Sequence, residues 1–241
     1  MNEQYNRTVG VSAETDLGLK SFMLGTYRYM AMAMGVTAIT AFLTGQYLVA
    51  NPAMMGFIYN PIMSLVVIGV VMVGFGIVGK KLPSMSLGGV LTFLFGFAAF
   101  MGVIMSGIGM MYSPVIIAKI FFMTVAMFAG LSLFGYTTGF NLGSIVKYAF
   151  IAFMAYVAIN VLGMFVPALA PSGPMDMVIT GIALIAISVI IAWETQLLKR
   201  IYYGSAGNPA MMKKLSAFGA ASLLLAFINL FQILLSLFGR E

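Results

Sequence analysis

The sequence predicts an all-α integral membrane protein with seven transmembrane helices, and three observations support this. Of its 241 residues, 62% are hydrophobic and only 7% are charged, whereas about a quarter or more of the surface residues of a water-soluble domain are charged. Seven apolar runs approach the length of about 20 residues that spans a bilayer as a helix. Lysine and arginine fall in alternate connections between these runs. We therefore expect the lipid bilayer to surround the chain.

The seven apolar runs are separated by residues that end helices. Asn60-Pro61 and Ser113-Pro114 are examples; proline lacks an amide donor and restricts the residue before it, so helices stop there. The connections are short, which makes consecutive helices antiparallel. We expect membrane-spanning helices over residues 29–50, 62–79, 86–108, 114–136, 146–168, 176–198 and 216–238.

The first 27 residues differ in composition from the rest of the chain. They contain charged residues and no apolar core, so they resemble a polar tail and not a cleavable signal peptide. The sequence therefore predicts two parts, a polar cytoplasmic N-terminal tail over 1–27 and a seven-helix transmembrane domain over 28–241.

The positions of the basic residues predict the orientation in the membrane. Cytoplasmic connections of membrane proteins carry an excess of lysine and arginine. In the seven-span arrangement only Lys119 and Arg240 fall on one side, and ten others fall on the opposite side. These ten are Arg7, Lys20, Arg28, Lys80, Lys81, Lys147, Lys199, Arg200, Lys213 and Lys214. We expect the N-terminus in the cytoplasm and the C-terminus outside, and the scattered cations form no stripe that would bind nucleic acid.

The composition also excludes several classes of chemistry. Cysteine and histidine are absent, which excludes disulfides, imidazole general bases and the common zinc sites. The two aspartates, Asp16 and Asp176, lie at opposite ends of the predicted bundle, so they do not form the apposed pair of an aspartyl protease. No phosphate-binding glycine loop is present. We expect neither enzymatic activity nor a cofactor or metal centre.

Glu194 is the one acidic residue placed inside an apolar run, in the segment AWETQLLKR. A charge at that depth is costly, and the positions three and four residues later are Leu197 and Leu198, so no cation follows on the same helix face. The residue is a candidate for proton sensing or for an ion pathway. The plain alternative is an interfacial acid that reaches water.

The seventh apolar run carries a polar stripe. Ser222, Asn229 and Gln232 lie on one side of the predicted helix, and leucine, isoleucine and phenylalanine dominate the rest. Such a stripe faces protein or water. We consider a place on an ion pathway and simple hydrogen bonding between helices as equal alternatives.

Three segments carry a resemblance to a known family. LSLFGYTTGFNLGS at 131–144, AWETQLLKRIYYG at 192–204 and AFINLFQILLSLFG at 226–239 are similar to motifs of the Bax inhibitor-1/YccA family, the transmembrane Bax inhibitor motif-containing proteins. The resemblance covers roughly residues 25–240. It implies a fold in which the seventh helix is central and surrounded by the other six. Family members are described as proton-sensitive calcium leak channels, as suppressors of cell death and, in bacteria, as partners of a membrane-anchored AAA protease.

The resemblance also implies a role for Glu194. In the family two carboxylates, one on each of the last two helices, share a proton and control the cytoplasmic mouth. Here Glu194 matches the first position and Ala226 replaces the second, so we expect the paired switch to be absent. A lone carboxylate must be neutral, hydrated or paired with a cation. The candidate partners on the same predicted side are Lys80, Lys81 and Lys147.

Two functions follow as expectations from this resemblance. The first is a multi-pass protein of the bacterial inner membrane that modulates an AAA protease of the FtsH type through its 27-residue tail. The alternative is a pH-sensitive leak channel for calcium or other cations, weakened because Ala226 replaces the second acid. The expected partners are thus the lipid bilayer and either the protease or calcium ions, with no nucleic acid.

Overall fold

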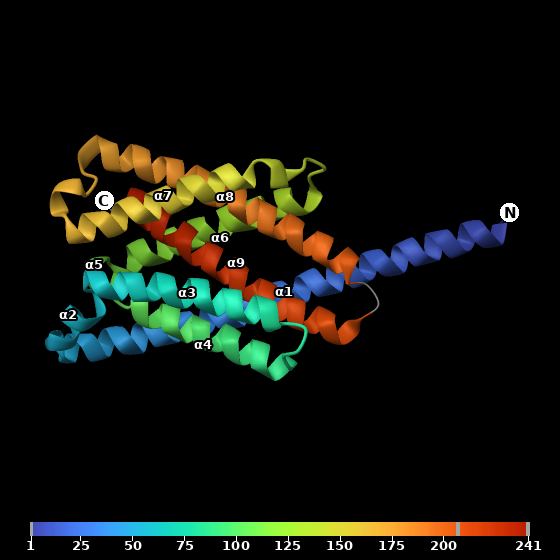
Figure 1. Cartoon of the computed structure of the whole chain (residues 1–241), viewed down its shortest axis with the longest axis horizontal. Helices are drawn as coiled ribbons and strands as arrows, with labels where there is room; N and C mark the ends of the chain where they lie inside the picture. The colour runs from blue at the N-terminus through green and yellow to red at the C-terminus, as the bar shows by residue number, and fades with distance from the viewer. Residues whose placement is uncertain (1, 206–207, 240–241) are drawn as a thin grey trace.

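The seven predicted spans are present as seven long helices (Figure 1). The computed structural model describes the backbone of residues 2–205 and 208–239, and the side chains of 17–205 and 208–239. Within these residues there is no strand, and the seven-span all-α fold is confirmed. The long helices are α1 (Asn2–Ala50), α3 (Pro61–Lys81), α4 (Leu87–Met105), α6 (Pro114–Thr137), α7 (Val146–Phe165), α8 (Gly173–Gly204) and α9 (Pro209–Phe238).

Several helices begin where the sequence offers a cap. The side chains of Asn60, Ser86 and Ser113 each accept a hydrogen bond from a backbone amide in the first turn of α3, α4 and α6 respectively, which satisfies a donor that the helix itself leaves free. Proline follows directly in α3 and α6, where its missing amide costs nothing. Short elements fill the connections: η1 (Pro52–Met54), α2 (Met55–Ile58), α5 (Ile108–Met111), η2 (Leu142–Ser144) and η3 (Pro167–Leu169).

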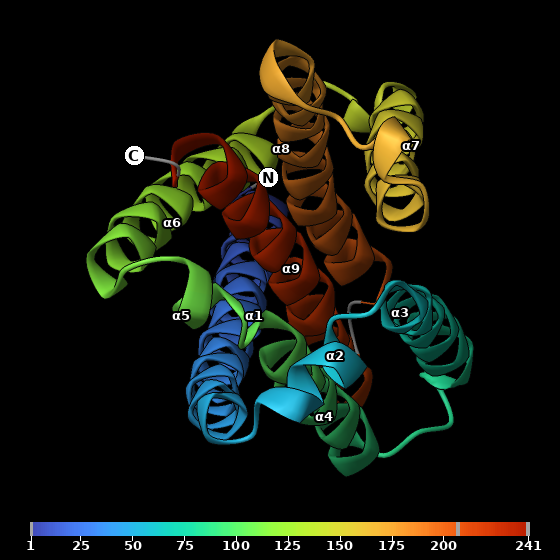
Figure 2. The same cartoon turned by 90° about the vertical axis from the view of Figure 1, so that its left-hand side faces the viewer.

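Helix α9 is the most deeply buried of the seven spans. Figure 2 shows it between α1, α4, α6 and α8, with α3 and α7 further out. In its most apolar stretch 61% of the residues are buried, against 6% in α3 and in α7. The structure therefore places four helices along α9, and α3 reaches it through the rings of Phe75 and Phe218. The stronger expectation, that all six other helices surround it, stays a prediction.

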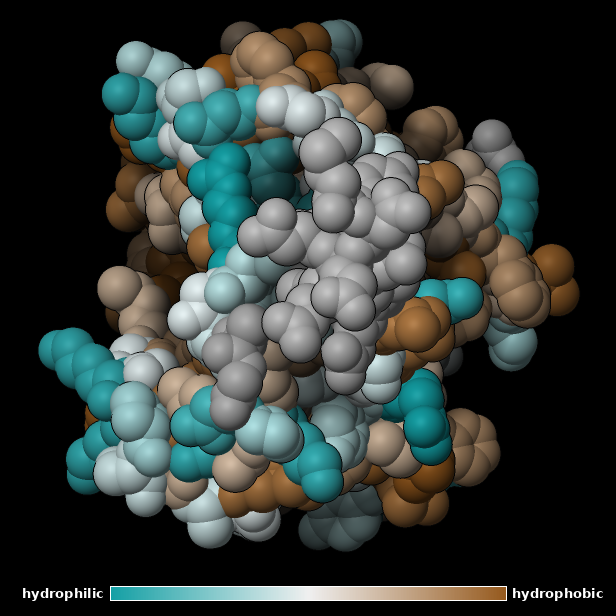
Figure 3. Space-filling model, turned by 90° about the vertical axis from the view of Figure 1, so that its right-hand side faces the viewer, coloured by the Kyte–Doolittle hydropathy of each residue, from teal (hydrophilic) through white to brown (hydrophobic). Residues whose placement is uncertain are grey.

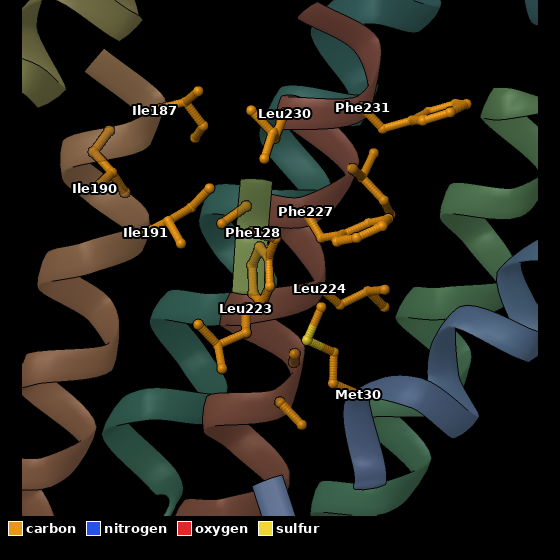
Figure 4. Packing of buried hydrophobic residues seen from close by; sticks show 14 of the residues in the cluster. Met30, Phe128, Ile187, Ile190, Ile191, Leu223, Leu224, Phe227, Leu230 and Phe231 are labelled. Carbon is orange, nitrogen blue, oxygen red and sulfur yellow. The ribbon is translucent and has the colours of Figure 1, made fainter. Parts of the chain in front are cut away.

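The core forms where large side chains of α9 meet the neighbouring helices. Figure 4 shows Ile187 and Ile191 of α8 pointing toward α9 from one side and Met30 of α1 approaching it from another, and Ile190 of α8 belongs to the same buried core. Branched aliphatic and aromatic side chains fill such interfaces without leaving polar groups unpaired. The α9 residues in this view are Leu223, Leu224, Phe227, Leu230 and Phe231.

The first helix starts earlier than the apolar run predicts. The backbone of α1 is helical from Asn2 onward, and its first turns extend beyond the other helices in Figure 1. Leu19 and Phe22 are already buried in the bundle, and Phe22 packs on the ring of Tyr202. Thr26 shares a 3.0 Å hydrogen bond with Ser216 of α9. Packing within the bundle thus begins before residue 28, the predicted start of the membrane domain.

One end of the bundle collects the basic residues. The connections α3–α4, α6–α7 and α8–α9 all lie at this end (Figure 1), and hydrophilic residues gather on it in Figure 3. We call it the basic face and define it by Lys80, Lys81, Lys147, Lys199, Arg200, Lys213 and Lys214. Its assignment to the cytoplasm stays a prediction.

Candidate functional site: a glutamate between α8 and α9

Glu194 lies on α8 and faces α9. Its Oε1 accepts a 2.7 Å hydrogen bond from the hydroxyl of Ser222. Its Oε2 is buried and has no hydrogen-bond partner among the residues that the structure describes. The structure thus joins two of the predicted site residues, and it leaves half of the carboxylate unsatisfied inside the membrane, where a polar group without a partner is costly.

Small residues let α8 and α9 approach closely next to this hydrogen bond. Gly219 of α9 faces Leu198 of α8, and a Cβ added at Gly219 would lie only 2.5 Å from a methyl group of Leu198. Ala220 and Ala221 are fully buried on the same helix. Small side chains are typical of tightly packed helix pairs in membranes. The contact between Leu198 and Gly219 lies about one helical turn from Glu194 and Ser222, on the side of the basic face.

A second close contact fixes how α8 is rotated. Gly135 of α6 packs directly against the backbone carbonyl of Ala192, and Thr195 donates a 3.3 Å hydrogen bond to Ser132 of α6. Residues on either side of Glu194 in the chain are therefore held against α6. Because neighbours in a helix point about 100° apart, this contact directs Glu194 toward α9.

The predicted charge partners do not meet the carboxylate. Lys80 and Lys81 end α3 and are exposed, and the amine of Lys147 lies 4.9 Å from the ring centre of Tyr148. Lys199 of α8 itself donates to the carbonyl of Tyr136 at 3.2 Å. Within the described part of the chain, the one hydrogen bond of the Glu194 side chain comes from Ser222.

The remaining two candidates continue the stripe along α9. Asn229 is half-buried and Gln232 is exposed in the protein without its membrane. Ala226, at the position of the missing acid, is buried one turn beyond Ser222. In the described residues neither amide side chain has a hydrogen-bond partner. The stripe therefore leads from the hydroxyl of Ser222 toward the end of the bundle opposite the basic face. Its two amide oxygen atoms accept no hydrogen bond from the described part of the protein.

A cluster on the basic face escaped the sequence-based prediction. The Oε1 atom of Gln196 accepts hydrogen bonds from the amide of Leu142 at 3.2 Å and from Arg200 at 2.9 Å, and its Nε2 donates to the carbonyl of Phe140 at 2.8 Å. Arg200 also donates to Asn141 at 2.8 Å. These contacts hold the α6–α7 connection on α8, two turns or less from Glu194. They join two of the three segments that resemble family motifs, 131–144 and 192–204. That resemblance was the one signal in the sequence that pointed to these residues.

A lysine secures the neighbouring connection. The amine of Lys214, near the start of α9, donates to the carbonyls of Pro83 and Met85 at 3.0 and 2.9 Å. The α3–α4 connection is thereby held on α9. Two of the three connections of the basic face are thus fixed by side chains of α8 and α9, the same helices that carry Glu194 and Ser222.

The described residues contain no group of three or more histidine, cysteine, aspartate or glutamate side chains that would hold a metal ion. Glu194 is the one carboxylate at the α8–α9 interface among them. Hydroxyl and amide oxygens on α9 are the other possible ligands. Such a set suits transient contact with a hard cation, since stable calcium sites have 6–8 oxygen ligands.

Comparisons with known proteins agree with this architecture. The chain is 29% identical to an uncharacterized protein of Caulobacter vibrioides, over 99% of this chain and 97% of the relative. It is 27% identical to the uncharacterized protein RP147 of Rickettsia prowazekii, over 98% of both chains. It is also 29% identical to the inner membrane protein YbhL of Escherichia coli, over 93% of both chains.

The match to a family model is equally extensive. The model described as "Inhibitor of apoptosis-promoting Bax1" matches residues 19–241, which include every described transmembrane segment from its first buried residues onward. Together with seven apolar helices, the relationship to YbhL places the chain in the inner (plasma) membrane as a multi-pass protein. The chain belongs to the Bax inhibitor-1 family.

Proposed function

We propose that this protein is a proton-responsive leak pathway for cations, and that Glu194 is the group that binds the proton. The observation that carries the proposal is the carboxylate between α8 and α9, which has one oxygen bonded to Ser222 and the other buried without a described partner. An ionisable residue inside a membrane is costly and is typical of ion and proton pathways. A proton or a cation entering the bundle would fill the unsatisfied oxygen.

The polar stripe of α9 supplies the approach to this carboxylate. From Ser222 to Gln232 the helix rises about 15 Å, roughly half of the hydrocarbon thickness of a bilayer. Asn229 lies between them, and its side chain has no hydrogen-bond partner in the described residues. Hydroxyl and amide oxygens replace the hydration shell of hard cations such as calcium. A cation would therefore enter from the face opposite the basic face.

The tight contact of Leu198 with Gly219 forms the barrier on the other side. This contact lies between Glu194 and the basic face, and Leu198 and Gly219 belong to α8 and α9, the two helices that carry the site. Dry, close-packed side chains block ions because an ion there loses its hydration without gaining ligands. A leak then requires α8 and α9 to separate at this contact, and ionisation of Glu194 would favour the separation by drawing water to the interface.

Calcium uptake into liposomes tests this proposal. The full-length protein, reconstituted with an encapsulated calcium dye, is compared with Glu194→Leu and with the control Asp176→Asn, which alters the other acid of α8 at the opposite end of the helix. We expect Glu194→Leu to reduce uptake to the level of empty liposomes and Asp176→Asn to retain it. Equal uptake by the unmodified protein and Glu194→Leu would refute the proposal.

A second candidate function is modulation of a membrane-anchored AAA protease. The observation that favours it is the N-terminal part of α1, which extends beyond the other helices (Figure 1) and carries the charged residues of the tail. A protruding segment is a natural attachment point for a protein that works on the same side of the membrane.

Deletion of the protruding segment tests the second function. The deletion must end at residue 16, because Leu19, Phe22 and Met23 are buried in the bundle and their removal would disturb folding. We expect the protein lacking residues 2–16 to insert into the membrane and to have the same stability to unfolding as the complete chain. It should no longer co-purify with the protease. Unchanged co-purification would contradict this second function and leave the leak proposal unaffected.

A further inference from the structure

An open groove runs between α1 and α6 on the basic side of the bundle. Its volume is about 1150 Å³, above the roughly 300–1,000 Å³ typical of pockets for drug-sized ligands. Phe227 of α9 lines its base together with Met30 of α1 and Phe128 of α6, and all three are buried (Figure 4). The groove is open to the outside of the bundle, on a surface that we expect lipid to cover.

The lining of the groove changes from charged to apolar along the membrane normal. Lys20 of α1 and Lys199 of α8 line the end at the basic face, where Tyr136 and Tyr203 add hydroxyl groups. Helix α1 enters the bundle from the basic face and the antiparallel α6 returns to it (Figure 1), so the first part of α1 and the last turn of α6 meet at the charged end of the groove. The described lining residues include no acid, so the polar end of the groove is suited to an anion.

The length of the groove corresponds to one leaflet of the bilayer. Along α1 the lining extends from Leu17 to Met34, a rise of about 26 Å. Along α6 it extends from Val125 to Tyr136, a rise of about 16 Å. The hydrocarbon part of a single leaflet is about 15 Å thick. The groove therefore spans one leaflet with its headgroup region and ends near the middle of the membrane.

Lys199 is positioned to bind an anion at the mouth of the groove. Its amine donates to the carbonyl of Tyr136 at 3.2 Å and lies 5.0 Å from the centre of the Tyr136 ring. These contacts hold the half-buried side chain in place. A lysine amine has three donors, so two remain for an incoming phosphate. Lys20 is exposed at the same end.

We propose that this groove binds an anionic phospholipid drawn from the leaflet at the basic face. The phosphate lies between Lys20 and Lys199, and one acyl chain follows Met30, Phe128 and Phe227 toward the middle of the membrane. A neutral phospholipid would fill the apolar part but would gain little from the two cations. The predicted topology makes this leaflet the cytoplasmic one, where anionic lipids attract basic residues. The bound lipid would join α1 to α6, two helices that flank α9.

Lipid retention tests the charged end of the groove. The full-length protein is equilibrated with equal amounts of phosphatidylglycerol and phosphatidylcholine in detergent, repurified, and its retained lipids are measured by mass spectrometry. We expect retained phosphatidylglycerol to exceed phosphatidylcholine. Lys20→Gln combined with Lys199→Gln should reduce this preference on the order of tenfold, since each lysine near an anionic headgroup contributes substantially to binding. The control pair Lys80→Gln and Lys81→Gln, exposed on the same face but outside the groove, should keep it.

A second pair of variants tests the apolar part. Ala129 of α6 lines the groove, whereas Ala126 is exposed on the same helix outside it. Ala129→Phe should reduce retention of both phospholipids, and Ala126→Phe should leave it unchanged. Thermal unfolding of each variant reports whether it folds, and if Lys199→Gln fails to fold, the exposed Lys20→Gln alone and Ala129→Phe decide the matter. Equal retention of the two lipids by the unmodified protein, or an equal effect of the control variants, would overturn the proposal.

Discussion

Ser222 of α9 donates its hydroxyl to Oε1 of Glu194 on α8 at 2.7 Å, across an interface in which the second carboxylate oxygen is buried without a described partner. This pair replaces the two-acid arrangement that the family resemblance implies, because Ala226 occupies the second acidic position. A serine hydroxyl, unlike a second carboxyl group, cannot share a titrating proton with Glu194. The site therefore binds at most one proton.

Removal of the Ser222 hydroxyl should show how much this hydrogen bond contributes to the free energy of unfolding. Ser222→Ala leaves the buried carboxylate without a donor, and we expect it to lower the free energy of unfolding by about 1–3 kcal/mol. The control Ser236→Ala alters a half-buried serine near the end of the same helix and should change stability little. In a Glu194→Leu background Ser222→Ala should be nearly neutral, because both partners are then apolar. Chemical unfolding in detergent is measured for the unmodified protein and each of these variants, and equal effects of Ser222→Ala in both backgrounds would contradict the pairing.

The close approach of α6 and α8 should tolerate no side chain at Gly135. A Cβ at this position would overlap the backbone carbonyl of Ala192, whereas a Cβ at Gly130 of the same helix meets open space. We expect Gly135→Ala to lower the free energy of unfolding by roughly 1–3 kcal/mol. Gly130→Ala should be neutral or slightly stabilising, since alanine favours helices over glycine. Comparable stability of the two variants, measured by thermal unfolding, would show that the helices do not meet here.

The Gln196 cluster should control the mobility of the α6–α7 connection. Gln196→Ala removes contacts to Phe140, Leu142 and Arg200, so we expect faster hydrogen exchange of the Leu142 amide and of its neighbours. Exchange follows local opening, and the loss of three contacts at about 0.5–1.5 kcal/mol each should accelerate it by tenfold or more. The exposed Gln232→Ala serves as the control. Unchanged exchange in Gln196→Ala would mean that the connection is held by other contacts.

The seven spans were predictable because hydropathy and proline mark them strongly. Each predicted run lies within a helix or shares most of its length with one. The parts that the sequence did not predict are polar extensions, such as α1 before residue 28 and α9 from Pro209 onward. Where these extensions lie inside the bundle, they pack on other helices, as Thr26 does on Ser216. Hydropathy gives no information about such contacts.

The candidate site was predictable as a list of residues but not as a set of contacts. The sequence singled out Glu194 and Ser222 separately, because each interrupts an apolar run. Their contact depends on the relative rotation and height of α8 and α9, which Gly219 and Gly135 set through close approach. The role of Gln196 escaped prediction for the same reason, since its partners lie on a connection whose path the sequence does not specify.

The orientation in the membrane can be tested directly in this cysteine-free chain. Ser205 lies at the basic face after α8, and the exposed Ser172 lies at the opposite end before it. Because basic connections are retained in the cytoplasm, a membrane-impermeant maleimide should label Ser172→Cys in intact cells and should label Ser205→Cys only after lysis. Labelling of Ser205→Cys in intact cells, with Ser172→Cys protected, would invert the topology.

The pH dependence of calcium flux tests whether Glu194 is the group that binds the proton. Liposome flux is recorded from about pH 4 to pH 8, the range in which most carboxyl groups of proteins titrate, for the unmodified protein, Glu194→Gln and Ala226→Asp. Glutamine keeps an acceptor for Ser222 but carries no charge. Ala226→Asp adds an acid one helical turn from Ser222 and creates two interacting carboxyl groups.

In the unmodified protein, flux should fall as the pH falls, because protonation removes the negative charge that attracts the cation, and the profile should follow a single proton. Glu194→Gln should show low flux without pH dependence over the same range, and Ala226→Asp should show a steeper, two-proton profile. A steep two-proton profile in the unmodified protein, or an unchanged pH-dependent flux in Glu194→Gln, would contradict this role of Glu194.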